Sequence, residues 1–104
     1  MSEVTIFLIY APNCQHCEQM EIATNEAIKR SNIPCNLKKL LYTNKVAINI
    51  ALKSGISDLP GLAVGTNGES FCGDDYSEER IVNAIKKVAN SWIKKNQEKQ
   101  KQQK

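Results

Sequence analysis

Short apolar runs and segments of helical periodicity alternate along the first third of the chain. Residues 4–10, VTIFLIY, are nearly all apolar, β-branched or aromatic, and this composition predicts a strand buried on both faces of a sheet. Pro12 and Asn13 end the run. Apolar and small residues then recur at spacings of three and four as far as residues 31–32, which predicts a helix directly after the first strand.

The middle of the chain repeats this order of strand and helix. Residues 35–41 follow a proline and alternate imperfectly between apolar and basic positions, so we expect a second strand there. Thr43 or Asn44 can cap a short helix that Gly55 ends. Strands joined through helices run parallel, so this half of the chain predicts a parallel arrangement.

A hairpin signal follows. Residues 62–64 and 70–72 predict two short strands, and Asn67-Gly68 accepts the positive φ values that a tight hairpin turn requires. This turn makes the last pair of strands antiparallel. The order strand-helix-strand-helix-strand-strand-helix therefore predicts an α/β fold, in which helices cover both faces of a mixed four-stranded sheet.

The final helix has a regular apolar stripe. Asp75, with Glu78 three residues later, resembles a capping box at its start. The stripe consists of Ile81, Ile85, Val88, Ala89 and Trp92. Because no apolar residue follows position 93, we expect residues 1–93 to form one domain and residues 94–104 to form a frayed helix extension or a disordered tail.

Composition narrows the class of protein. The chain has 104 residues, 41% of them hydrophobic and 24% charged, which suits one small folded domain. Its net charge of +3 comes from the tail, where five lysines and one acidic residue give +4, so that the domain carries −1. A nearly neutral domain gives no reason to expect specific nucleic-acid binding. The longest apolar run is too short to span a membrane, and it lacks the features of a signal peptide. We therefore expect a cytoplasmic monomer with reduced cysteines.

Cys14 and Cys17 form the candidate redox site. They stand three residues apart where the first strand gives way to a helix, so their sulfur atoms can reach each other. At the start of a helix, free backbone N–H groups stabilise a thiolate, which is the species that attacks a disulfide. We expect Cys14 to attack a substrate disulfide and Cys17 to release the reduced substrate. A Cys-x-x-Cys pair is also half of a zinc site, but its place after a buried strand favours redox chemistry.

Two segments resemble the thioredoxin family. Residues 9–17, IYAPNCQHC, are similar to the family's apolar-aromatic-Ala-x-x-Cys-x-x-Cys segment. Residues 55–64, GISDLPGLAV, followed by the Asn-Gly-Glu of a hairpin turn, resemble its Gly-Ile-x-x-apolar-Pro segment. The resemblance implies a thioredoxin fold over nearly the whole domain and a dithiol–disulfide oxidoreductase activity. It also implies that Pro60 is a cis proline beside the cysteines and that Leu59 offers its backbone to a substrate strand.

The sequence departs from the family around the motif. Asn13 replaces the usual tryptophan, and Gln15-His16 replaces Gly-Pro between the cysteines. The family's buried aspartate, six residues before the first cysteine, is Leu8 here, so that proton removal from the second cysteine must rely on water or another group. His16 resembles the corresponding residue of protein disulfide isomerase. We expect it to favour the thiolate of the first cysteine and to make the disulfide a stronger oxidant than that of thioredoxin; the alternative is a solvated histidine with little influence.

Tyr10, Asp74 and Asp75 complete the candidate substrate site. Tyr10, beside the redox loop, either lines the substrate groove or covers the end of the strand. The Gly-Asp-Asp run at residues 73–75 resembles the segment with which glutaredoxins hold glutathione, although the lysine that glutaredoxins place before the first cysteine is missing. The plainer interpretation is a turn that caps the last helix.

Together these residues predict an enzyme that reduces or exchanges the disulfides of protein substrates, without a bound cofactor or metal and with a reductase or glutathione as electron donor. One alternative is a glutathione-dependent, glutaredoxin-like enzyme that uses Asp74 and Asp75. Another is a metal-binding or redox-inert adaptor on the same fold. Cys35 and Cys72 fit no common zinc spacing with the pair, and we expect them to be small apolar strand residues.

Overall fold

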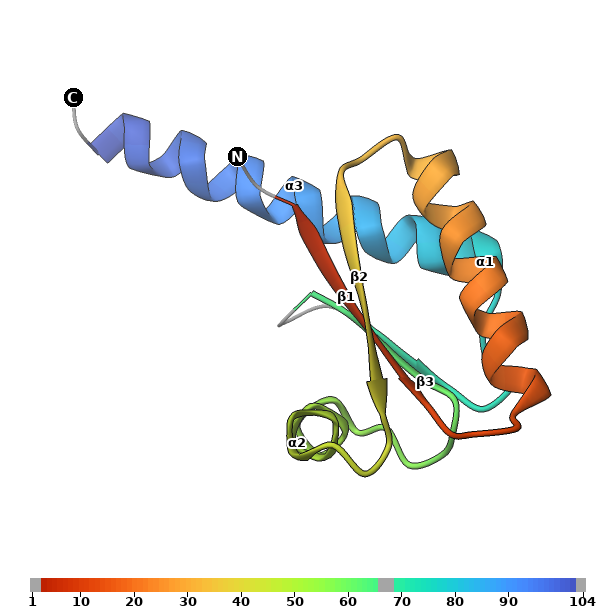
Figure 1. The fold of residues 1–104 in the computed structure, drawn as a ribbon. Coiled ribbons are helices and arrows are strands. Elements are labelled where there is room, and N and C mark those ends of the chain that lie inside the picture. The colour runs from red at the N-terminus through yellow and green to blue at the C-terminus, as the bar shows by residue number, and fades with distance from the viewer. Residues whose placement is uncertain (1–2, 66–68, 103–104) are drawn as a thin grey trace.

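The elements occur in the predicted order. The computed structural model describes residues 3–65 and 69–102, with side chains as far as residue 91, so the predicted Asn-Gly turn and the side chain of Trp92 lie outside the described parts. Figure 1 shows the elements, which are β1 (Val4–Tyr10), α1 (Gln15–Ser31), β2 (Cys35–Leu41), α2 (Lys45–Ser54), β3 (Gly61–Val64), β4 (Ser70–Cys72) and α3 (Glu78–Gln102).

The four strands form a mixed sheet in the order β2-β1-β3-β4. β1 pairs with β2 in parallel, from Val4 opposite Cys35 to Tyr10 opposite Leu41. β3 is antiparallel to both β1 and β4. Helices α1 and α3 pack against each other on one face of the sheet, and α2 lies on the other (Figure 1). The α/β class, the mixed four-stranded sheet and the helices on both faces are therefore confirmed.

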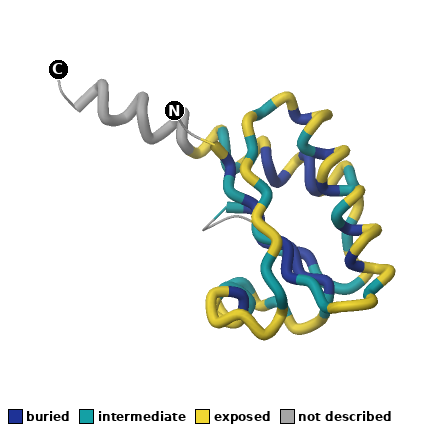
Figure 2. The backbone as a smooth tube through the Cα atoms, in the orientation of Figure 1, coloured by how far each residue is buried: buried dark blue, intermediate teal, exposed yellow. Residues whose placement is uncertain are grey.

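The core lies between the sheet and the α1–α3 layer, where Figure 2 shows the buried backbone concentrated. Val4, Ile6 and Leu8 point toward these helices and are fully buried. Thr5 and Phe7, which alternate with them, are only half-buried. The prediction that this strand is buried on both faces is therefore wrong for part of the second face, because α2 has only ten residues and covers one end of it.

Local hydrogen bonds set the ends of the helices. Of the two predicted caps for α2, Asn44 is the one used, and its side chain accepts a hydrogen bond of 2.8 Å from the N–H of Val46. Gly55 ends that helix with a φ of 70°, a left-handed conformation that glycine adopts without strain. α3 continues past the predicted domain boundary at residue 93 as far as Gln102. None of the described helices is long and apolar enough to cross a membrane.

The predicted capping box at Asp75 is wrong. α3 begins at Glu78, and Ser77 caps it by accepting a hydrogen bond of 3.2 Å from the N–H of Arg80. Asp75 instead lies in the turn before the helix, where its carboxylate accepts a hydrogen bond from the Arg80 guanidinium. A hydroxyl at residue 77 satisfies an N–H of the first turn more directly, so the Asp-x-x-Glu spacing was misleading.

We expect the Ser77→Ala variant to lose about 1 kcal/mol of unfolding free energy, because an N–H at the start of α3 loses its partner. Urea denaturation followed by circular dichroism measures this loss. The Asp75→Ala variant is the matched control, and it should change stability little because its ion pair is exposed. Equal losses in the two variants would contradict the assignment of Ser77 as the cap.

Candidate functional site

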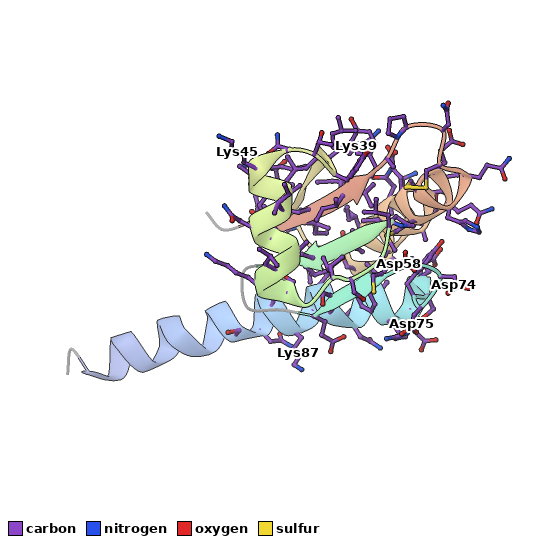
Figure 3. All side chains as sticks on the ribbon, turned by 90° about the horizontal axis from the view of Figure 1, so that it is seen from below. Lys39, Lys45, Asp58, Asp74, Asp75 and Lys87 are labelled. Carbon is purple, nitrogen blue, oxygen red and sulfur yellow. A yellow bond between two sulfur atoms is a disulfide. The ribbon has the colours of Figure 1, made fainter. Side chains whose placement is uncertain are left out.

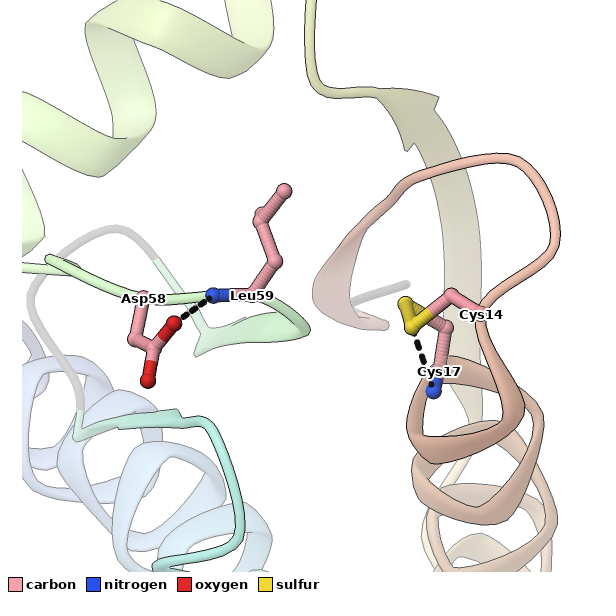
Figure 4. Close-up of a disulfide and its surroundings, with 4 residues drawn as sticks. All are labelled: Cys14, Cys17, Asp58 and Leu59. Atoms are coloured by element: carbon pink, nitrogen blue, oxygen red, sulfur yellow. Dashed lines mark hydrogen bonds between the residues drawn. A yellow bond between two sulfur atoms is a disulfide. The ribbon is translucent and has the colours of Figure 1, made fainter.

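Cys14 and Cys17 form a disulfide at the junction of β1 and α1, with their Cα atoms 5.2 Å apart. Cys14 is the N-cap residue of α1 and has an extended backbone, and its Sγ accepts a hydrogen bond of 3.1 Å from the N–H of Cys17 (Figure 4). Cys14 is half-buried, whereas Cys17 is only 5% exposed. The sulfur at the helix start is therefore the one that solvent and a partner can reach.

The loop before the disulfide turns sharply at Asn13. Its φ of 56° lies in the left-handed region, which asparagine tolerates better than most residues with a side chain. The turn carries the chain from the end of β1 to the start of α1 within four residues, from Ala11 to Cys14. Asn13 thus has a conformational role at the position where the thioredoxin family carries tryptophan.

The loop between α2 and β3 faces the disulfide. Figure 4 shows Leu59 and the cysteine pair on opposing loops. The Leu59–Pro60 peptide bond is cis, as the resemblance implied, and Pro60 is buried. The next residue, Gly61, needs to be glycine, because a Cβ there would lie 2.7 Å from Cγ2 of Ile56. These contacts hold Leu59 half-buried at the surface, on the loop that faces the disulfide.

The side chain of Asp58 forms a hydrogen bond with a backbone N–H group of this loop. The N–H of Leu59 donates a hydrogen bond of 2.9 Å to Oδ1 of Asp58 (Figure 4). On the other side of Asp58 lies Gly73, whose N–H donates to the carbonyl of Pro60 at 2.9 Å and whose Cβ, if present, would lie 3.1 Å from the Asp58 carboxylate. The sequence prediction did not include Asp58; the signal for it was an aspartate next to an X-Pro pair, where Asp side chains bond nearby backbone N–H groups.

Asp74 and Asp75 lie in the turn that follows Gly73. In Figure 3 they are at the end of the molecule that carries the disulfide, close to Asp58. Both are exposed, and Asp75 accepts a hydrogen bond of 2.9 Å from the Arg80 guanidinium. Neither lines the cavity beside the cysteines. The structure thus groups the two residues with Asp58 and the cis-proline loop, and their predicted role in binding glutathione or substrate stays a prediction.

A cavity of about 220 Å³ lies beside the cysteine pair. Its lining includes both cysteines, Tyr10, Glu18, Glu21 and Lys39. Nζ of Lys39 lies 3.0 Å from Oε1 of Glu21 and 5.5 Å from the centre of the Tyr10 ring. The hydrogen bond and the negative charge of Glu21 raise the pKa of Lys39. Tyr10 is therefore part of this cavity, and the Glu21–Lys39 pair is a feature that the sequence did not predict.

A second, mainly apolar groove of about 260 Å³ runs from Leu59 along α2. Ile9 and Ala47 form part of its wall, and Ile48 and Leu52 are exposed along it. The groove and the disulfide therefore meet at the cis-proline loop, from two different sides.

The remaining candidates lie apart from these contacts. His16 is exposed at the start of α1, and in the described part of the chain its imidazole forms no hydrogen bond. Cys35 is half-buried on β2; its thiol donates to the carbonyl of Ile33 at 3.2 Å, and burial, followed by the charge of Glu3, raises the pKa of that thiol. Cys72 is half-buried on β4. Within residues 3–65 and 69–91, no three potential metal-ligating side chains come together.

Solved structures with the same fold are thioredoxins and related proteins. An uncharacterized thioredoxin-like protein from Clostridium perfringens aligns with a TM-score of 0.65 at 16% identity, over 82% of this chain and 70% of its own. Thioredoxin-2 of the malaria parasite aligns at 0.56 and 21% identity, over 82% of both chains. Mitochondrial thioredoxin 3 from Saccharomyces cerevisiae aligns at 0.54 and 17% identity, over 84% of this chain and 80% of its own. No protein-family model and no curated protein matches the sequence.

The protein therefore has a thioredoxin fold, as the two sequence segments implied. At these levels of identity the comparisons define the fold. The chemistry of the site depends on its own residues, which are a Cys-x-x-Cys pair at disulfide distance and the cis-proline loop that faces it.

We expect Cys14 of the reduced protein to react with iodoacetamide at lower pH than Cys35 does. The N–H of Cys17 and the start of α1 stabilise negative charge on the Cys14 sulfur, whereas burial disfavours the Cys35 thiolate. Mass spectrometry of alkylated peptides across a pH series measures both. If His16 favours the thiolate, His16→Ala moves the Cys14 profile to higher pH and leaves that of Cys35, the internal reference, in place; coincident Cys14 and Cys35 profiles would contradict the expectation.

Proposed function

We propose that the protein is a dithiol–disulfide oxidoreductase in which Cys14 attacks and Cys17 resolves. The observation that carries this proposal is the position of Cys14, which caps α1 and is more exposed than its partner, with the N–H of Cys17 directed at its sulfur. This arrangement stabilises a thiolate where a substrate can reach it. The cis-proline loop, which faces the pair, supports a place for the substrate on that side.

The reaction follows from the two sulfur environments. The Cys14 thiolate attacks one sulfur of a substrate disulfide, forms a mixed disulfide, and releases the other substrate sulfur as a thiolate. Cys17 then loses its proton and attacks the Cys14 sulfur, so that the bond to the substrate breaks and its electron pair leaves with the second substrate thiolate. The substrate is reduced by two electrons, and the Cys14–Cys17 disulfide seen in the structure is the oxidised product.

We propose protein disulfides as substrates, with an extended substrate segment on the Leu59 backbone. The apolar groove that begins at Leu59 supports this choice, because it offers room for a substrate side chain beside the loop that faces the disulfide. The glutaredoxin-like alternative has weaker support, because the Asp75 carboxylate is already engaged by Arg80. A reductase or glutathione returns the electrons, and His16 tunes the first thiolate.

We expect the Cys17→Ser variant to accumulate mixed disulfides on Cys14, because the resolving sulfur is gone while the attacking one remains. Mass spectrometry of the variant after incubation with oxidised protein substrate and oxidised glutathione identifies what Cys14 holds. Protein adducts are the expected result. The control is the Cys14→Ser, Cys17→Ser double variant, which should hold none.

Other outcomes of this experiment separate the alternatives. Adducts with glutathione alone would favour the glutaredoxin-like enzyme. An absence of adducts would overturn the exchange mechanism, and stoichiometric zinc in anaerobically purified wild-type protein would then favour the metal-binding adaptor.

We expect the Asp58→Ala variant to bind a peptide disulfide more tightly, with the Michaelis constant lowered about fivefold. A substrate strand that pairs with Leu59 must break the hydrogen bond between the Leu59 N–H and Asp58, at a net cost of about 1 kcal/mol. Steady-state kinetics with a peptide disulfide measures the constant, and a small aromatic disulfide, which does not need the Leu59 backbone, should react at the wild-type rate.

Asp74→Ala is the matched control for Asp58→Ala, because it removes a neighbouring charge from the same end of the molecule without freeing the Leu59 N–H. A similar decrease in both variants would show a simple charge effect and contradict the proposed pairing.

A further inference from the structure

The buried sulfur of the pair shares a cavity with an ion pair between a helix and the sheet. We propose that Glu21, held in place by Lys39, accepts the proton that Cys17 must lose before it resolves the mixed disulfide. This inference rests on the proposed function and adds to it the proton acceptor of the second step.

The second step needs a proton acceptor because of where Cys17 lies. The residue is only 5% exposed, so bulk water reaches the thiol poorly, and only the thiolate can attack. On the sheet side, the cavity wall that could carry a carboxylate is formed by Leu8, which is fully buried and apolar. The acceptor has to come from another element that lines the same cavity.

Glu21 meets this requirement by its position on α1. It follows Cys17 by four residues, so the two side chains lie on the same face of the helix, one turn apart. Both line the cavity of about 220 Å³, which has the volume and the polar groups to hold a water between them. A water in this cavity can therefore carry the proton from the thiol to the carboxylate.

Lys39 fixes the carboxylate in this position. It stands on β2 directly opposite Leu8, and its Nζ lies 3.0 Å from Oε1 of Glu21. Glu21 is thereby tethered between helix and sheet, with its side chain 32% exposed, so that an accepted proton can pass on to solvent. Because the hydrogen bond and the charge of Glu21 raise the pKa of Lys39, the lysine remains charged and continues to hold the carboxylate.

The other ionisable groups that face the cavity do not have this arrangement. Tyr10 on β1 lies under the Lys39 ammonium. Glu18 on α1 is exposed and only one residue after Cys17, so it points to a different side of the helix. Glu21 is thus the carboxylate that combines the right helix face with a fixed position.

The Cys17 thiol gives its proton to Glu21, and the resulting thiolate attacks the Cys14 sulfur of the mixed disulfide. The bond between Cys14 and the substrate sulfur breaks, and its electron pair leaves on the substrate thiolate. Glu21 then releases the proton to solvent, and the protein is left with the Cys14–Cys17 disulfide.

The test separates attack from resolution in a single turnover. Reduced protein is mixed with a smaller amount of dithiobis(nitrobenzoate), which releases one coloured thiolate when Cys14 attacks and a second when Cys17 resolves. The first phase depends on protein concentration, and the second has a concentration-independent rate. We expect Glu21→Gln to slow the second phase about tenfold near neutral pH and to leave the first unchanged.

The pH profile distinguishes proton transfer from a structural effect. The deficit of Glu21→Gln should shrink as the pH rises, because a growing fraction of the Cys17 thiol then ionises without the carboxylate. A variant that merely distorted α1 would be slow at every pH. Glu21→Asp keeps a carboxylate and should recover part of the lost rate.

Two control variants complete the design. Glu26→Gln removes a carboxylate from the same helix outside the cavity, and Glu18→Gln removes one that lines the cavity but forms no ion pair with Lys39. Both should resolve at the wild-type rate. A second phase that is unchanged or faster in Glu21→Gln, or equally slow in Glu18→Gln, overturns the assignment of Glu21. Loss of the first phase in the wild-type protein would instead overturn the proposed function.

Discussion

The antiparallel pairing of β1 with β3 is the constraint on which the site depends. Ile9 lies opposite Gly61, so the end of the central strand meets the residue that follows the cis proline. Cys14 follows Ile9 by five residues, and Pro60 directly precedes Gly61. A shift of this register by one residue would turn the buried side chains of β1 away from the core, and each contributes about 2 kcal/mol through burial. The core therefore fixes the distance between the two loops that carry the chemistry.

The start of α1 combines a structural with a chemical role. A helix normally uses Ser, Thr, Asp or Asn as its N-cap, since an oxygen satisfies one of the free N–H groups. Here the sulfur of Cys14 takes that place, accepting from the N–H of Cys17. A neutral sulfur is a weaker hydrogen-bond acceptor than an oxygen, but a charged thiolate accepts more strongly than the neutral thiol. The helix start thus favours the charged form that disulfide exchange requires.

Charges on two sides of the disulfide divide the tasks of the proposed reaction. On the cis-proline side, Asp58 holds the Leu59 N–H, so that substrate binding competes with an internal hydrogen bond. In the cavity beside the pair, the Glu21–Lys39 ion pair faces the buried sulfur. The thioredoxin family has a carboxylate on the first strand, at the position of Leu8. In the proposed mechanism, Glu21 on α1 provides the carboxylate instead.

The sequence by itself determined the order of elements, the mixed sheet and the cysteine pair, because these depend on local periodicity and on spacing within one turn of helix. The error at Asp75 also arose locally, because two residues of one turn, Asp75 and Ser77, could both serve as a cap. The backbone N–H of Arg80 donates to Ser77, and only the Arg80 guanidinium donates to Asp75. The tertiary structure alone decided how far each face of β1 is buried, since that depends on the length and position of α2.

Only the tertiary structure placed Glu21 against Lys39 and Asp58 between the cis-proline loop and Gly73. Glu21 and Lys39 are far apart in the chain, on a helix and a strand whose separation depends on side-chain packing between them. No periodicity in the sequence records that packing. The physical reason is the range of the interactions: spacing along one helix or strand is written in the sequence, whereas contacts between elements exist only after the core has closed.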